Sequence, residues 1–174
     1  EHDSLNADPE LICFSIDRAL QVLGLHRSYM KDCAVFMFGS VTSLLAAPDD
    51  LFTKLEKMKA AVYINIGLES VDQSTIDLIG KPVSVDNVLS AYDRMQEIND
   101  RFRTIEMTGN FVTSQELPDS HFSSLATLLS ERLARPRVKG SIYLSPMKFD
   151  DPSRAKLFDF YRFKLMSKLP LFLY

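Results

Sequence analysis

The sequence predicts an α/β fold in which parallel β/α repeats form part of a TIM-type barrel. Short apolar runs that end at glycine or polar residues alternate four times with segments whose apolar residues follow helical spacing. Strands and helices that alternate in this way form parallel strands joined by right-handed crossovers. Four repeats correspond to half of an eight-fold barrel, or alternatively to a small doubly wound sheet. We expect one domain over residues 1–174, a half barrel of about four strands with flanking helices.

The composition is that of a globular domain and excludes several functional classes. Of the 174 residues, 25% are charged and 46% are hydrophobic, which excludes disordered and collagen-like chains. The net charge of -3 is spread along the chain, so we expect binding to neither nucleic acids nor membranes. The two cysteines, Cys13 and Cys33, lie in apolar surroundings, as is typical of reduced thiols. The sequence therefore predicts a cytoplasmic protein.

The first third of the chain predicts two helices and two strands. Residues 8–10 read Asp-Pro-Glu, which is typical of a helix start, and apolar residues at helical spacing continue to Gly24. Residues 33–39 form an apolar run too short for a helix, so a buried strand is favoured. Asp49 and its neighbour cap the next helix, and residues 61–67 form the second strand.

The middle of the chain predicts a short helix, a long helix and a third strand. Residues 74–79 form the short helix, which ends at Gly80 and Pro82. Ser84 caps the long helix, and the third strand covers residues 104–112.

The last third predicts two helices, a fourth strand and a strand-like end. A helix is capped near Asp119, and His121 in its first turn is expected to be exposed to solvent. Residues 140–145 form the fourth strand. A helix follows from about Asp151, and residues 169–174 end the chain as a strand-like segment.

Polar residues occupy one side of the predicted strands. A parallel sheet covered on both faces is apolar on both sides, whereas these strands alternate apolar and polar residues. Burying such polar groups without partners costs about 1–3 kcal/mol each, so this face meets a wet cavity, a polar ligand or another polar surface, unless its groups pair with one another. We therefore favour a barrel arc with a polar lumen. The residues expected to converge there are Asn65, Glu69, Asn110, Tyr143 and Ser145.

The strand ends carry the remaining chemical signal. The chain has no dinucleotide-binding glycine motif, phosphate-binding loop, zinc-protease motif or nucleophile elbow, and its three histidines are scattered. Residues 67–70 read Gly-Leu-Glu-Ser and follow the second strand, while residues 109–112 read Gly-Asn-Phe-Val and end the third. Ligands bind at the carboxyl ends of parallel strands, so Glu69 and Asn110 are expected to face one crevice.

These segments resemble a known family. The run Val-Tyr-Ile-Asn-Ile-Gly-Leu-Glu-Ser-Val-Asp at 62–72 and Ile-Gly-Lys-Pro-Val-Ser at 79–84, followed by Asn-Phe-Val at 110–112 and Leu-Pro at 117–118, are similar to the second half of the partial barrel of radical S-adenosylmethionine enzymes. The resemblance covers about residues 9–170. It implies S-adenosylmethionine contacts from five residues: Glu69 and Ser70 to the ligand, Lys81 to its methionyl carboxylate, Asn110 to the ribose, and Ser145 beside the adenine.

The chain departs from that family at the iron–sulfur cluster. Family members hold a [4Fe-4S] cluster with a three-cysteine loop, whereas Cys13 and Cys33 are twenty positions apart. The resemblance therefore implies that the chain is the C-terminal portion of a longer Fe-S oxidoreductase-like parent, which would use both the cluster and S-adenosylmethionine on a substrate not readable from the sequence. The parent chemistry would be reductive cleavage of S-adenosylmethionine to a 5′-deoxyadenosyl radical. We expect the chain alone to bind no cluster and to be inactive.

Two other functions stay open at this stage. One is a small aldolase- or hydrolase-like protein that uses Glu69, Glu106 and Lys81. The other is an interaction module, because the first strand has an open edge beside Phe36 and Phe38 with no charge or proline to protect it. We expect either self-association through this edge or coverage of the edge by residues 1–6.

Overall fold

The computed structural model describes residues 3–24, 33–58, 60–131, 139–147 and 154–173. Its elements follow one another as η1 (Ser4–Asn6), α1 (Pro9–Val22), β1 (Ala34–Ser40), α2 (Val41–Ala46), α3 (Asp49–Glu56), β2 (Ala61–Glu69), α4 (Gln73–Leu78), α5 (Val85–Arg101), β3 (Ile105–Thr113), α6 (Asp119–Glu131), β4 (Ile142–Pro146), α7 (Arg154–Met166) and β5 (Leu171–Leu173). The predicted helix start at Asp151 and the last residue, Tyr174, lie outside the described residues.

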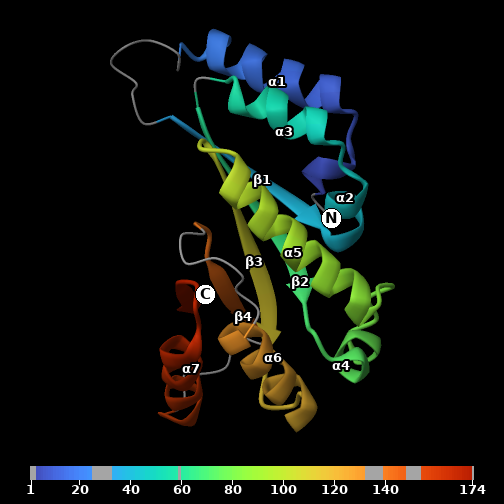
Figure 1. Ribbon diagram of the computed structural model, residues 1–174, viewed down its shortest axis with the longest axis vertical. Coiled ribbons are helices and arrows are strands. Elements are labelled where there is room, and N and C mark those ends of the chain that lie inside the picture. Colours follow the sequence, from blue (N-terminus) through green and yellow to red (C-terminus); the bar gives the residue numbers. More distant parts are fainter. Residues whose placement is uncertain (1–2, 25–32, 59, 132–138, 148–153, 174) are drawn as a thin grey trace.

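All five strands are parallel, and each pairs with its neighbour in the sequence, in the order β1-β2-β3-β4-β5 (Figure 1). A doubly wound sheet reverses its strand order at a switch point, whereas this sheet does not. The α/β class is therefore confirmed, and the topology is that of a partial parallel barrel. There are five strands rather than about four, because β5 pairs with β4 at the end of the sheet.

The helix ends follow the sequence signals. The Asp8 carboxylate accepts hydrogen bonds from the backbone N–H groups of Glu10 and Leu11 at 2.9 and 3.1 Å, which confirms the predicted start of α1. The Ser84 hydroxyl caps α5. Pro48, not Asp49, is the cap residue of α3. Asp49 and Asp50 instead occupy the first turn, where their negative charges interact favourably with the helix dipole.

One helix was not predicted. The six-residue α2 directly follows β1, and Ser40 and Ser43 form a capping box in which each hydroxyl accepts a hydrogen bond from the other residue's backbone N–H. A helix this short shows fewer than two turns of periodicity, so the apolar pattern alone did not separate it from a loop.

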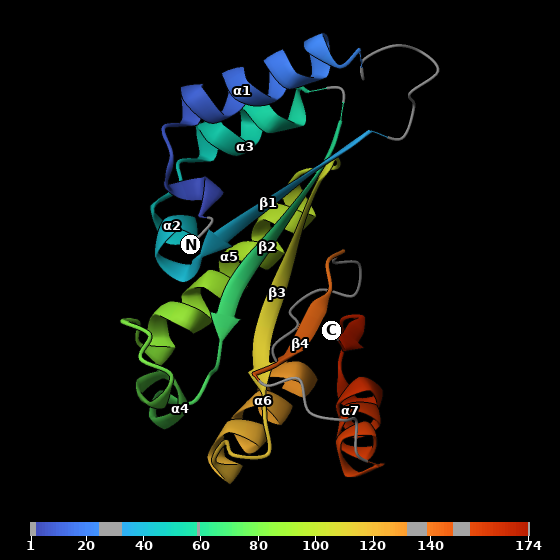
Figure 2. The same ribbon diagram turned by 180° about the vertical axis from the view of Figure 1, so that it is seen from behind.

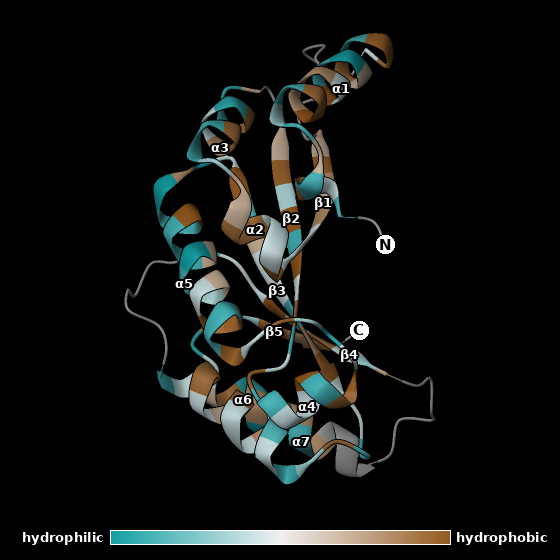
Figure 3. Cartoon of the chain, turned by 90° about the vertical axis from the view of Figure 1, so that its right-hand side faces the viewer, coloured by the Kyte–Doolittle hydropathy of each residue, from teal (hydrophilic) through white to brown (hydrophobic). Residues whose placement is uncertain are grey.

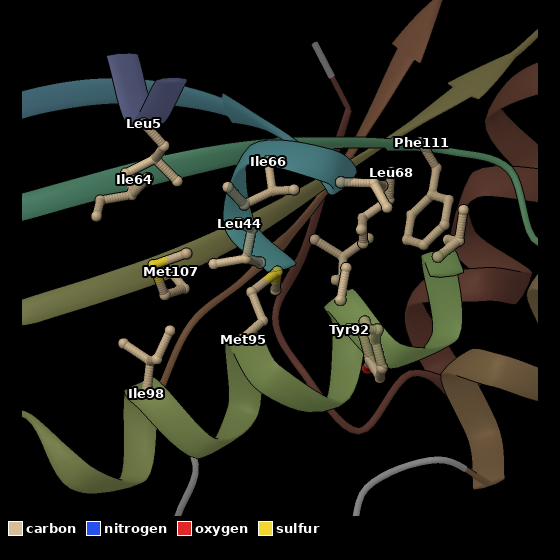
Figure 4. Packing of buried hydrophobic residues seen from close by; sticks show 14 of the residues in the cluster. Leu5, Leu44, Ile64, Ile66, Leu68, Tyr92, Met95, Ile98, Met107 and Phe111 are labelled. Carbon is tan, nitrogen blue, oxygen red and sulfur yellow. The ribbon is translucent and has the colours of Figure 1, made fainter. Parts of the chain in front are cut away.

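The core lies between one face of the sheet and the helices. Along β2, alternate residues are buried, and Ile64, Ile66 and Leu68 are fully buried. Figure 4 shows these side chains on the same side as Tyr92 and Met95 of α5. In Figure 2 the strands stand in front of α5, and Figure 3 shows both hydrophobic and hydrophilic segments along that helix. The helices thus leave the opposite face of β2 and β3 free for the polar residues.

The open edge of β1 is partly covered by the chain itself. The backbone N–H of Phe38 donates to the Ser4 hydroxyl at 3.4 Å, and the Ser40 hydroxyl donates to the Asp3 carboxylate at 2.6 Å. Leu5 is buried against Gly39. Residues 3–6 therefore cover the carboxyl end of this edge, in line with the expectation that residues 1–6 fold over it. Phe36, nearer the start of the strand, is 72% exposed. The first two residues lie outside the described part.

Among the described residues, no helix is both long enough and apolar enough to cross a bilayer.

Candidate functional site

The polar residues of adjacent strands share one face of the sheet, as predicted. Asn65, Gly67 and Glu69 are only half-buried, and they alternate with the fully buried residues of β2. The register places Gly67 beside Asn110, and Asn110 beside Tyr143. We call this side of the sheet, opposite α5, the open face.

A hollow of about 300 Å³ lies on the open face. Its lining consists of Phe38, Gly39, Asn65, Gly67, Asn110 and Ser145. The Ser145 hydroxyl donates to the Asn110 side-chain oxygen at 2.6 Å, and the Asn65 amide donates to the Thr108 hydroxyl at 2.8 Å. These hydrogen bonds therefore join side chains of neighbouring strands, and Asn65, Asn110 and Ser145 also line the hollow.

An ion pair lies beside Gly67, one of the residues that line this hollow. The Lys81 ammonium lies 3.2 Å from the Glu69 carboxylate, with side-chain exposures of 38% and 17%. Gly80 ends α4 with φ +68°, a conformation that costs glycine little, and so turns the chain toward Lys81. An ion pair on the protein surface adds at most about 1 kcal/mol to stability, and the lysine of this pair is partly exposed.

Glu69 has the unusual backbone of the site. Its φ is +65°, the only positive value at a non-glycine residue in the described part of the chain. The Ser70 N–H donates to the Leu68 carbonyl at 2.8 Å, so Glu69 is the central residue of the rare γ-turn with positive φ. Strain of this kind costs of order 1–3 kcal/mol and clusters at functional sites. It also brings the Glu69 carboxylate back over Gly67, where a β-carbon would lie only 2.9 Å from the carboxylate oxygen.

Ser70 lies away from the other predicted contacts. Its side chain is fully buried, and its hydroxyl lies 2.8 Å from Nδ1 of His121. The structure therefore brings Glu69, Lys81, Asn110 and Ser145 to the open face and places Ser70 behind it, where its hydroxyl serves the fold of the turn.

The expectation that His121 is exposed to solvent is wrong. The residue is fully buried, and its Nε2 lies 3.1 Å from the Val112 carbonyl. Burial lowers the pKa of His121, although the bond to the Val112 carbonyl and the Asp72 carboxylate oppose that effect, so the neutral imidazole is favoured. The helix-start pattern around His121 carries no signal of this, because its partners, Val112 and Ser70, lie outside the helix.

Aromatic pairs on the open face were missed by the sequence analysis. Phe36 stacks on Tyr63 with ring centroids 5.2 Å apart, and Tyr143 stacks on Phe172 at 5.5 Å. The register across the strands pairs Phe36 with Tyr63 and Tyr143 with Phe172. The alternation of residues along β1 could have indicated such a contact, because Phe36 and Phe38 lie on the same face of the sheet as the polar residues of β2.

The structure separates the residues of the aldolase- or hydrolase-like alternative. Glu106 pairs with Tyr63 near the start of β2, whereas Glu69 ends that strand. Six residues of strand correspond to about 20 Å. Glu106 is therefore too distant to act with Glu69 and Lys81 on one small substrate.

The cysteines do not fit an iron–sulfur cluster. Cys13 lies on α1 and Cys33 precedes β1, and both are free thiols. Burial raises the pKa of the Cys13 thiol, which disfavours the thiolate that such a cluster requires. Within the described ranges, no group of three histidine, cysteine or acidic residues could hold a metal ion.

Similarity to known proteins gives no guide to the function of this site. No known protein family, curated protein or solved structure matches this chain significantly.

Proposed function

We propose that the open face binds S-adenosylmethionine and that the chain is the C-terminal part of a radical S-adenosylmethionine enzyme. The observation that carries this proposal is a hollow at the carboxyl ends of parallel strands that Asn110 and Ser145 line. The Glu69 carboxylate, paired with Lys81, lies over Gly67, which also lines the hollow. Ligand sites of parallel β/α folds lie at this edge of the sheet.

The charged pair suits the methionyl end of the ligand. That end is a zwitterion, with a carboxylate for Lys81 and an α-ammonium group for Glu69. Asn110 offers an amide group suited to the ribose hydroxyls, and Ser145, which hydrogen-bonds to Asn110, would lie beside the adenine. The hollow of about 300 Å³ is at the lower end of the range for small-molecule sites.

The residues of this chain bind and orient the ligand. When bound, S-adenosylmethionine supplies radical chemistry that depends on one electron from a [4Fe-4S] cluster. With only two cysteines in the sequence, we place the cluster on another part of a longer parent. Both thiols are free, which suits the reducing cytoplasm that we also propose.

Calorimetric titration of the full chain with S-adenosylmethionine tests the proposal. We expect one site, and we expect weaker binding of 5′-methylthioadenosine because it lacks the methionyl charges. The absence of binding at ligand concentrations of about 1 mM would contradict the proposed function. A dissociation constant of that size corresponds to a binding free energy of roughly -4 kcal/mol.

The uncovered part of the β1 edge supports a separate expectation of self-association. Phe36 is exposed there, beyond the segment that residues 3–6 cover. An apolar strand edge is a template for pairing with another chain, and a lysine blocks such pairing. We expect light scattering to show dimers or larger species that Phe36→Lys reduces to monomers. A wild-type protein that stays monomeric at about 0.1 mM would contradict this expectation. Its free energy of association would then be weaker than roughly -5.5 kcal/mol.

A further inference from the structure

We infer that His121 is a positioning residue, which holds the strained turn that presents Glu69 to the open face. The inference deepens the proposed function and rests on it only in taking Glu69 as a ligand contact. Ser70 directly follows Glu69, and both Ser70 and His121 are fully buried behind the turn.

The direction of each hydrogen bond follows from its partners. A carbonyl only accepts, so Nε2 of His121 carries the proton and donates to Val112. Nδ1 of the neutral ring then accepts from the Ser70 hydroxyl at 2.8 Å. The Ser70 oxygen in turn accepts from the backbone N–H of Asp72 at 3.0 Å. When His121 is neutral, every donor in this buried series of hydrogen bonds therefore has an acceptor.

The bonds of His121 join the ends of two strands. Ser70 stands one residue after Glu69 on β2, and Val112 stands two residues after Asn110 on β3. At this point the β2–β3 register shifts between Gly67 and Glu69, so ordinary strand pairing does not set the position of the turn. One imidazole thus connects Ser70 and Val112, which follow the site residues Glu69 and Asn110 in the sequence.

The strain at Glu69 makes such a connection necessary. A non-glycine residue at φ +65° relaxes toward negative φ unless its surroundings prevent it. Relaxation would move Ser70 away from His121 and leave buried polar groups unpaired, which opposes the change. Without His121, the turn loses that constraint and the Glu69 carboxylate loses its defined position over Gly67.

Asn99 provides a matched control for a role in packing alone. It is 4% exposed, its side-chain amide donates to the Met107 carbonyl at 2.9 Å, and its side-chain oxygen accepts from the Met107 N–H at 2.7 Å. Like His121, it is a buried polar residue that makes two hydrogen bonds. Its partner Met107, however, lies near the start of β3 and away from the turn at Glu69. Its loss should affect stability without affecting the turn at Glu69.

Amide hydrogen exchange and ligand titration on the full chain test the inference. We compare His121→Phe, which preserves an aromatic ring, Ser70→Ala and Asn99→Ala, at a temperature where each variant is folded. Both of the first two should accelerate exchange of the residue-70 amide, which donates to the Leu68 carbonyl across the turn, at least about ten-fold relative to its neighbours. His121→Phe, which keeps the Ser70 hydroxyl, should also accelerate exchange of the Asp72 amide. Both variants should also weaken S-adenosylmethionine binding about ten-fold, while Asn99→Ala changes neither.

The outcomes separate the inference from the proposed function. If the wild type binds no S-adenosylmethionine but exchange accelerates locally in both variants, the proposed function fails and the role of His121 in the turn stands. If both variants retain wild-type exchange of the residue-70 amide, or accelerate all amides equally, the inference is overturned. Should His121→Phe fail to fold, exchange of the residue-70 amide in Ser70→Ala decides, because its bond to the Leu68 carbonyl does not involve the lost hydroxyl.

Discussion

Replacing Gly140 with alanine should destabilise the protein by about 3 kcal/mol or more. Gly140 has φ +109°, which is unfavourable for any residue with a side chain. A β-carbon there would lie 2.6 Å from the Met107 carbonyl oxygen and 2.5 Å from the Asn99 amide nitrogen. The Met107 carbonyl belongs to β3 in the middle of the sheet, so the backbone has to shift to admit the methyl group. Urea unfolding followed by circular dichroism measures the loss.

Gly80→Ala is the matched control. Gly80 also has positive φ, +68°, but no heavy atom lies within 4 Å of a β-carbon built there. This variant should lose only about 1 kcal/mol, from backbone strain alone. Equal losses in the two variants would show that the close contact at Gly140 is not the cause.

Replacing Lys81 with glutamate should weaken binding of S-adenosylmethionine about 100-fold. The change removes the cation proposed to bind the methionyl carboxylate and places a second carboxylate beside Glu69. A hydrogen bond to a charged group contributes about 1.5–3 kcal/mol, and like charges repel the ligand further. Calorimetric titration of the two proteins measures the ratio of their dissociation constants.

Lys57→Glu makes the same change of charge at an exposed lysine that follows α3. We expect its affinity to match that of the wild type, because screening weakens charges far from the ligand. An unchanged affinity in Lys81→Glu would remove Lys81 from the site.

Local patterns were sufficient for most of the fold. The strands β1 to β4 lie within about two residues of their predicted positions, because short apolar runs with β-branched residues favour strands whatever their surroundings. The polar side of β2 was equally readable, since a strand places alternate residues on opposite faces. The same alternation predicted that Glu69 and Asn110 lie on one face, near the ends of adjacent strands.

The sequence by itself thus determined the α/β class, the parallel strands and the open polar face. Only the tertiary structure decided that Ser70 turns away from that face and that His121 is buried behind it. Their hydrogen bond joins residues 51 positions apart, and the positive φ at Glu69 accompanies a register shift between two strands. Patterns of period two or 3.6 report only which side of its own element a residue occupies. Which distant side chain fills the space behind a strand end depends on how the whole sheet packs against its helices.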